Sequence, residues 1–215
     1  MTTILRIDSS SRAVAAKGSE TEGSFSRALA DRVVTHLADQ HPGASIIERD
    51  LIANPIDHIA DETIKGYYTA PEDMSEALKA ATAQSDTLIA ELKAADTIVI
   101  SAPIYNFSVP SALKAWIDQI IRIGHTFSYE DGAFVGLVSD RPTYLVLSYG
   151  AAGYAPGGPL EAYDFLRPYL TGLMNFIGLT SVEVIVVEAT TAPDAQAHLA
   201  KANADVDARF AWMAA

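Results

Sequence analysis

The chain contains no cysteine. Disulfides, thiolate zinc sites, iron–sulfur clusters and cysteine nucleophiles are therefore excluded, because each of them needs a Cys sulfur. The five histidines do not fall at metal-binding spacings, and the H-E-x-x-H pattern of helical zinc sites is missing. We expect no metal centre.

Positive charge is also scarce. The 215 residues include 15 Lys and Arg against 27 Asp and Glu, a formal net charge of −12. Phosphate backbones and anionic lipid surfaces bind basic faces, so neither nucleic acid nor a membrane is expected as a partner. No apolar run approaches the roughly 18 residues that a membrane span needs. No secretory signal pattern is visible either, and the expected location is the cytoplasm.

Two nucleotide-binding patterns are missing as well. The sequence has neither the G-x-G-x-x-G fingerprint of dinucleotide folds nor the G-x-x-x-x-G-K-[ST] loop of NTPases. Both patterns bind the phosphates of nucleotides through glycine-rich loops. If the chain binds a phosphate-bearing ligand, a single phosphate is therefore favoured over a pyrophosphate.

What the chain does contain is a regular alternation of strands and helices. Apolar runs predict five strands, at 3–8, 45–50, 97–102, 143–148 and 182–187. Helical patterns occupy 24–40, 72–94, 110–121, 160–177 and 193–214, and the segment 126–138 predicts a hairpin. Strands separated by helices predict an α/β fold with a doubly wound, five-stranded parallel sheet between two helical layers. We expect one domain over residues 1–215.

Ligands bind such sheets at the carboxyl ends of the strands, here the loops 9–23, 103–109 and 148–158. In the first loop, Ser24, Phe25 and Ser26 open a helix, so hydroxyls and free N–H groups can hold a phosphate. The alternative is a plain serine N-cap on a surface loop. In the second loop, Tyr105, Asn106 and Phe107 suit a flat heteroaromatic ring, or they cover the sheet end. The third loop is glycine-rich and permits close backbone approach, or is an ordinary turn.

These loops resemble those of a known family. Pro103 to Phe107, followed by 109–114 and Asp118, is similar to the signature of flavodoxin-like NAD(P)H:quinone reductases. The fuller pattern resembles the bacterial FMN-dependent NADH-azoreductases, and the likeness runs from Met1 to the final helix. It includes Asp50, Ser85, Asp86, Gly124, Thr126, Tyr129 and the segments 136–138 and 176–178. The resemblance implies a flavodoxin-like fold, bound FMN, and NADH or NADPH as co-substrate.

By this resemblance, four groups of residues hold FMN. Ser10 follows the first strand; Ser24, Phe25 and Ser26 take the phosphate; Pro103, Ile104, Tyr105, Asn106 and Phe107 hold the ring; and Ser148, Tyr149, Gly150 and Ala151 reach the ring edge. Two features depart from the family pattern. Ala151 replaces a glycine, and the loop 9–23 is longer than expected, which leaves the placement of Ser10 open.

The resemblance also implies the chemistry. Hydride passes from the nicotinamide to FMN and then to a quinone or azo compound, in a ping-pong sequence, so no catalytic side chain is expected. Phe127 matches an aromatic that lines the acceptor side of the flavin, often across a dimer interface. Tyr67 and Tyr68 either cap the acceptor site or pack internally, and His125 either approaches the acceptor or ends a helix.

A homodimer is expected from the helix after Pro110. Its apolar stripe is wider than one sheet face needs, which predicts a two-fold contact with a second copy. The stripe consists of Leu113, Trp116, Ile117, Ile120 and Ile121. Two other functions remain open: a flavodoxin-type electron carrier, whose acidic surface would suit the net charge, and a flavin reductase with loosely held FMN.

Overall fold

The computed structural model describes residues 1–13 and 23–213. Five parallel strands form one sheet in the order β2-β1-β3-β6-β7. They are β1 (Thr3–Asp8), β2 (Ser45–Asp50), β3 (Thr97–Pro103), β6 (Thr143–Ser148) and β7 (Val182–Val187). All seven residues of β3 are buried, as its unbroken apolar run predicts. The strand order reverses between β1 and β3, and this reversal opens a crevice at their carboxyl ends.

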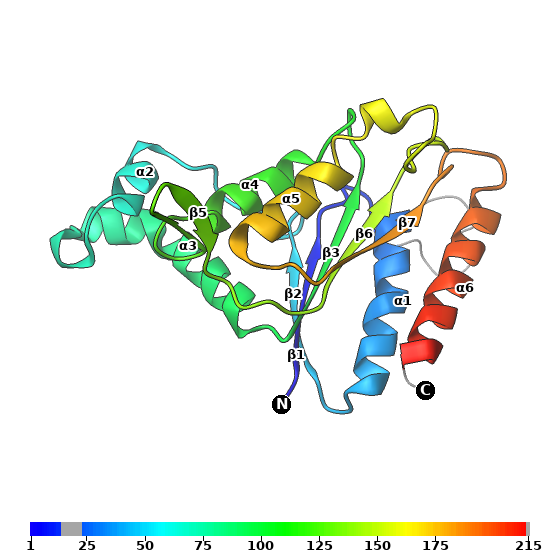
Figure 1. Cartoon of the computed structure of the whole chain (residues 1–215), viewed down its shortest axis with the longest axis horizontal. Coiled ribbons are helices and arrows are strands. Elements are labelled where there is room, and N and C mark those ends of the chain that lie inside the picture. The colour runs from blue at the N-terminus through cyan, green and yellow to red at the C-terminus, as the bar shows by residue number, and fades with distance from the viewer. Residues whose placement is uncertain (14–22, 214–215) are drawn as a thin grey trace.

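Helices cover both faces of the sheet (Figure 1). On one face lie α1 (Phe25–Gln40) and α6 (Ala195–Met213), and on the other lie α3 (Glu76–Ala94), α4 (Ser111–Ile120) and α5 (Arg167–Ile177). Each face buries its own cluster of apolar side chains. The predicted three-layer, flavodoxin-like α/β architecture is therefore confirmed.

Three helical segments differ from the prediction by more than two residues. A short helix, α2 (Asp61–Tyr67), occupies the segment without periodic cues. Helix α3 begins only at Glu76, after a 3₁₀ turn (Pro71–Asp73), because the Ser75 hydroxyl accepts the Leu78 N–H and caps it. The predicted helix 160–177 is a 3₁₀ turn (Glu161–Tyr163) followed by α5. Asp164 separates the two, because its carboxylate accepts the N–H groups at the start of α5.

The hairpin is confirmed as β4 (Phe127–Glu130) and β5 (Ala133–Gly136). Asp131 and Gly132 form its turn with φ values of 51° and 85°, the left-handed conformation that a two-residue turn needs. The hairpin lies on the end of α5. There the Val138 N–H donates to the Ile177 carbonyl at 2.9 Å.

The apolar stripe of α4 is buried within the chain and is not available to a second subunit. Leu113, Trp116, Ile117 and Ile120 are each at most 2 % exposed within the single chain, and Ile121 is partly buried. The stripe is wide because α4 packs against the sheet, α3 and the residues near α5 at once. The argument for a dimer from this stripe is therefore wrong.

Candidate functional site

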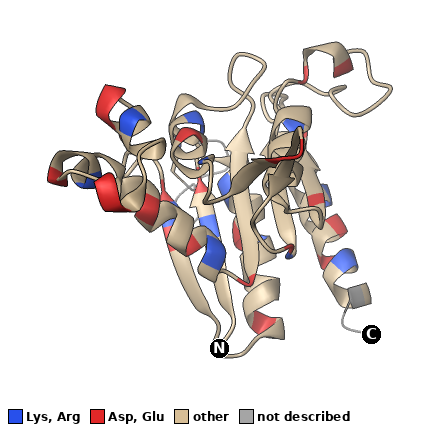
Figure 2. Cartoon of the chain, turned by 60° about the vertical axis from the view of Figure 1, so that its left-hand side comes forward, with Lys and Arg blue, Asp and Glu red and all other residues tan. Residues whose placement is uncertain are grey.

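A pocket of about 210 Å³ lies at the carboxyl ends of the strands, beside the start of α1. It is lined by Ser10, Arg12, Gly23, Ser24, Phe25, Pro103, Ile104, Tyr105, Ser148, Gly150, Thr190 and Thr191. None of these described lining residues is acidic, and one is an arginine. Figure 2 shows acidic and basic positions interspersed along the helices. The pocket therefore suits an anionic group.

The start of α1 supplies the anion-binding groups. Ser24 is the N-cap: its Oγ accepts the Arg27 N–H at 3.2 Å and lies 3.2 Å from Ser26 Oγ. Both hydroxyls are buried. The N–H groups of Phe25 and Ser26 lie in the first turn, where a helix offers them no carbonyl. Together with the positive end of the helix dipole, these groups fit a phosphate.

A strained turn forms the second side of the site. Tyr105 and Ser108 exchange two backbone hydrogen bonds of 3.0 Å, and the residues between them, Asn106 and Phe107, have φ values of 47° and 72°. A positive φ costs a side chain such as phenylalanine on the order of 1–3 kcal/mol. The neighbouring loop holds this conformation, because the Phe165 N–H donates to the Phe107 carbonyl at 3.0 Å. The Phe107 side chain is left 49 % exposed.

Tyr105 links this turn to the loop after β1. Its hydroxyl lies 2.7 Å from Ser11 Oγ and accepts the Ser11 N–H at 3.3 Å. Burial alone would raise the pKa of Tyr105, but hydrogen bonds from Ser11 and Ser10 outweigh it and lower the pKa. The described part of the long first loop is thereby held against the pocket, and Ser10 lines it.

The sequence prediction missed four lining residues: Arg12, Gly23, Thr190 and Thr191. The two threonines follow β7, the fifth strand, whose carboxyl end was not among the loops singled out. The strand-end rule that identified the other three loops would have found them. They are pinned in place, because Thr191 Oγ1 donates to the Gly150 carbonyl at 2.8 Å and the Thr190 N–H donates to the Tyr149 carbonyl.

Some predicted cofactor residues do not line the pocket. The Tyr149 side chain is fully buried and donates to Asp164 at 3.0 Å, so only its backbone faces the loop end. Burial, with the nearby Asp164 charge, raises the pKa of Tyr149. Ala151 is exposed, and Ser26 lies behind Ser24. Asn106 lies on the outer side of the strained turn, and Phe107 is exposed to solvent beside it.

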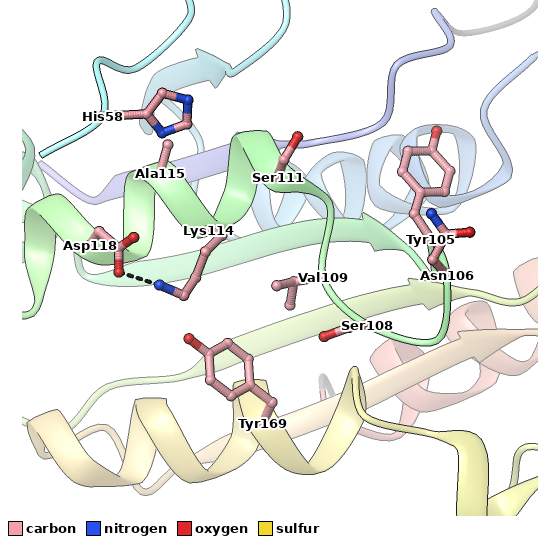
Figure 3. A pocket seen from close by; sticks show the side chains of 10 residues that line it. All are labelled: His58, Tyr105, Asn106, Ser108, Val109, Ser111, Lys114, Ala115, Asp118 and Tyr169. Carbon is pink, nitrogen blue, oxygen red and sulfur yellow. Dashed lines mark hydrogen bonds and ion pairs between the residues drawn. The ribbon is translucent and has the colours of Figure 1, made fainter.

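A second cavity of about 630 Å³ lies on that outer side, between α4 and α5 (Figure 3). Tyr105 and Asn106 form one end of it. Lys114, on α4, is paired with Asp118 at 2.5 Å, and its ammonium extends toward Tyr169 on α5. This larger groove therefore adjoins the first pocket across the 105–108 turn.

The predicted acceptor residues lie elsewhere in this chain. Phe127 packs between Phe134 and Phe176, with ring centroids 5.9 and 4.9 Å away, and it lines neither cavity. The Tyr67 hydroxyl donates to Gln119 at 2.9 Å, which favours the packing alternative for this residue.

Tyr68 and His125 are the other two residues that were predicted to approach the acceptor. Tyr68 is 75 % exposed. His125 is partly buried and lines neither cavity. Burial and the nearby Arg122 charge lower the pKa of His125.

Two further findings concern residues 1–13 and 23–213. Over these ranges, no group of His, Asp and Glu side chains is arranged to hold a metal ion. No helix in the same part of the chain has the length and apolar character that crossing a bilayer requires.

Comparison with known proteins identifies the family. A model of the flavodoxin-like fold matches residues 2–210. An FMN-dependent NADH:quinone oxidoreductase of Xanthobacter autotrophicus is 45 % identical over 184 residues, 86 % of this chain and 85 % of that protein. A second protein of this name, from Trichormus variabilis, is 40 % identical over 188 residues, 87 % of each chain.

A solved structure agrees with these relatives. The crystal structure of an azoreductase from Bacillus anthracis superposes with a TM-score of 0.81 at 26 % identity, covering 96 % of this chain and 99 % of that one. The chain therefore belongs to the flavodoxin-like fold family that includes the FMN-dependent NADH:quinone oxidoreductases.

Proposed function

We propose that this protein is an FMN-dependent oxidoreductase that transfers electrons from NADH to quinones and azo compounds. One observation carries the proposal: an acid-free pocket joins a capped helix start to a strained aromatic turn where the strand order reverses. The names of the relatives supply the donor and the acceptor classes. We also propose that residues 1–215 form one FMN-binding domain.

The residues that would hold FMN fall into three sets. The start of α1, with Ser24, Phe25 and the Ser26 N–H, would bind the phosphate, supported by Ser10. The segment 103–107 would hold the ring, and Ser148, the backbone of 149–151 and the two threonines 190 and 191 would close its edge. The supporting observation is that eight of these predicted residues line one pocket: Ser10, Ser24, Phe25, Pro103, Ile104, Tyr105, Ser148 and Gly150.

FMN, when bound, carries the hydride from donor to acceptor. The chain then has to bind and orient, not to act as a nucleophile. The rigid 105–108 turn offers exposed side chains on which flat molecules can stack, and its strain is held by the Phe165 contact. When FMN is bound, backbone N–H groups of these loops would donate to its ring and stabilise negative charge there.

The larger groove supports a place for the acceptor. It shares Tyr105 and Asn106 with the loop proposed to hold the ring, so an extended molecule at the ring would continue into it. Tyr68 lines neither cavity, so it would contact an acceptor only from outside them. We propose that Phe127 contacts the acceptor from a second copy of the chain.

We further propose a homodimer in the cytoplasm that does not use nucleic acid or membrane as a partner. The dimer rests on the placement of Phe127, which reaches neither cavity of its own chain. The acidic balance of 15 basic to 27 acidic residues supports the absence of phosphate-rich or anionic-lipid partners.

Steady-state kinetics test the function. The purified protein, loaded with FMN, should oxidise NADH with a small quinone or an azo dye, with no partner protein, and give parallel double-reciprocal lines. An electron-carrying flavodoxin would give no such turnover. A flavin reductase would lose its FMN on gel filtration and need added flavin. Intersecting lines with a ternary complex would contradict the ping-pong sequence, and a protein that takes up FAD but not FMN would contradict the cofactor.

A further inference from the structure

Arg27 departs from the usual chemistry of helix starts. It is the third residue of α1, in the first turn, where acidic side chains are favoured by the positive end of the helix dipole. The first turn of α1 has no acidic residue, and Arg27 is only 7 % exposed. A buried positive charge at this end of a helix is unfavourable unless nearby acidic or carbonyl groups offset it. Residues that oppose a local preference often mark functional sites.

Carboxylates at the ends of two strands, β1 and β2, offset the charge of Arg27. Arg27 donates through Nη1 and Nη2 to the two Asp50 carboxylate oxygens, at 2.7 Å each, and Asp8 Oδ2 lies 3.7 Å from Nη1. The hydrogen bonds to Asp50 raise the pKa of Arg27, and those from Arg27 lower the pKa of Asp50 to about 2. Both groups are therefore charged at neutral pH. Asp50 is itself held by the Ile52 N–H at 3.0 Å.

The same guanidinium reaches the rim of the pocket. Nη2 donates to the Ser10 carbonyl at 2.9 Å. The Ser10 hydroxyl accepts the Arg12 N–H at 3.2 Å, and both residues line the pocket. The backbone N–H of Arg27 donates to Ser24 Oγ. One residue thus ties together the end of β1, the cap of α1 and, through Asp50, the end of β2.

We propose that Arg27 is a positioning residue whose side chain fixes Ser10 beside the start of α1, around the cofactor phosphate, and that Asp50 holds Arg27 in this orientation. The inference rests on the proposed function, since it takes the phosphate to lie at the start of α1. Two carboxylates neutralise the guanidinium, so its contribution is geometric. A lysine would keep the charge, but its single ammonium cannot span Asp50 and the Ser10 carbonyl as a planar fork does.

A comparison of FMN with riboflavin isolates the phosphate, because riboflavin lacks only that group. Quenching of flavin fluorescence gives both dissociation constants for the wild type, Arg27→Lys and Asp50→Asn, with thermal unfolding recorded for each. Arg49→Lys is the matched control. Arg49 makes a comparable two-pronged pair with Glu91, but from the neighbouring position of β2, whose side chain points to the other face of the sheet.

We expect Arg27→Lys and Asp50→Asn each to lower the ratio of FMN to riboflavin affinity about tenfold, a loss of about 1.4 kcal/mol. Arg49→Lys should leave the ratio unchanged, even if it lowers the melting temperature. A merely structural role for Arg27 would weaken both flavins equally.

Two results would overturn the inference, and they differ in what else they affect. If the wild type prefers FMN but neither variant changes the affinity ratio, the positioning role is wrong and the proposed phosphate site still stands. If the wild type binds riboflavin as tightly as FMN, the proposed phosphate site is wrong, and the inference with it. Should Arg27→Lys fail to fold, the ratio in Asp50→Asn decides, because this variant keeps the arginine.

Discussion

Ser24 has two tasks at the start of α1. Its buried hydroxyl caps the helix by accepting the Arg27 N–H, and the same residue lines the pocket. Both tasks follow from one fact: a helix start has N–H groups without partners, which a hydroxyl or an anion can satisfy. A substitution that preserves the cap but adds negative charge separates the two.

Ser24→Asp is such a substitution. Aspartate caps helices as well as serine does, so the fold should persist. FMN affinity should fall at least about fivefold, because like charges about 4 Å apart repel by about 1 kcal/mol in water and by more near a protein surface. Riboflavin affinity should change little. Fluorescence titration measures both, and Ser75→Asp, at the cap of α3, is the control. Unchanged FMN affinity in Ser24→Asp would place the phosphate elsewhere.

Asp50 should make stability depend on pH in a defined acid range. Its folded pKa is about 2, below the roughly 3.9 of an unfolded aspartate, because of the Arg27 hydrogen bonds. The ion pair therefore stabilises the fold above about pH 4, and this contribution is lost as pH falls from 4 toward 2. In urea unfolding at pH 6, the free energy of unfolding of the wild type should exceed that of Asp50→Asn. This difference in free energy should be smaller at pH 3. A constant difference would show that the charge is not involved.

At the scale of elements, the hairpin is held to α5 by two glycines. A Cβ on Gly136 would lie 2.4 Å from the Gly178 nitrogen, and one on Gly178 would lie 2.4 Å from the Val138 carbonyl oxygen. Gly178 also ends α5 with φ 109°, a conformation that favours glycine. The sequence analysis noted segments 136–138 and 176–178 only because they resemble the family pattern. This backbone contact gives a physical reason why glycines are needed there.

Gly136→Ala should therefore destabilise the protein by about 2 kcal/mol or more, because the colliding atoms are backbone and cannot rotate away. Gly172→Ala is the matched control on α5. Apart from its chain neighbours and the backbone of its own helix, no described atom lies within 4 Å of the position of its Cβ, so alanine should stabilise the helix by about 0.5–1 kcal/mol. Urea unfolding measures both changes. Equal stabilities for the two variants would contradict the close approach.

At the scale of the whole molecule, the exposed aromatic side chains suggest where a second copy would bind. The α4 stripe is covered within the chain, but Phe107, Tyr163 and Phe165 remain exposed beside the strained turn. Tyr129 and Phe134 are exposed on the hairpin. Large exposed apolar groups often mark interaction surfaces. A two-fold contact that brings a hairpin near the other copy's turn would carry Phe127 toward the acceptor.

Complementation tests this arrangement. Ser24→Asp and Phe127→Ala should each lose most quinone reduction, and Phe127→Ala should retain FMN binding. If Phe127 acts across a two-fold interface, mixed dimers contain one intact site, so an equal mixture after subunit exchange should recover about a quarter of wild-type activity. No recovery would place Phe127 in its own subunit's site. Light scattering that gives an active monomer near the chain mass of 22.9 kDa would exclude the dimer.

The positions of the sheet strands could be predicted from the sequence alone. Each of the five strands was predicted within one residue of its observed bounds, because short apolar runs between turn residues report burial locally. The Ser24 cap and the turn at Asp131 and Gly132 were equally local, since a few neighbouring residues set their backbone conformation. The three lining loops followed from chain order, because parallel strands end at the same edge.

Which side chains are buried against which elements could not be predicted from the sequence. The α4 stripe looked too wide for one chain, yet several elements distant in sequence share it. Tyr149 looked like a pocket residue, but its side chain points to Asp164 in the core. The local pattern did not single out Arg27, whereas its contacts with Asp50 and Ser10 make it a link beneath the pocket. Such contacts join residues far apart along the chain, and local periodicity carries no information about them.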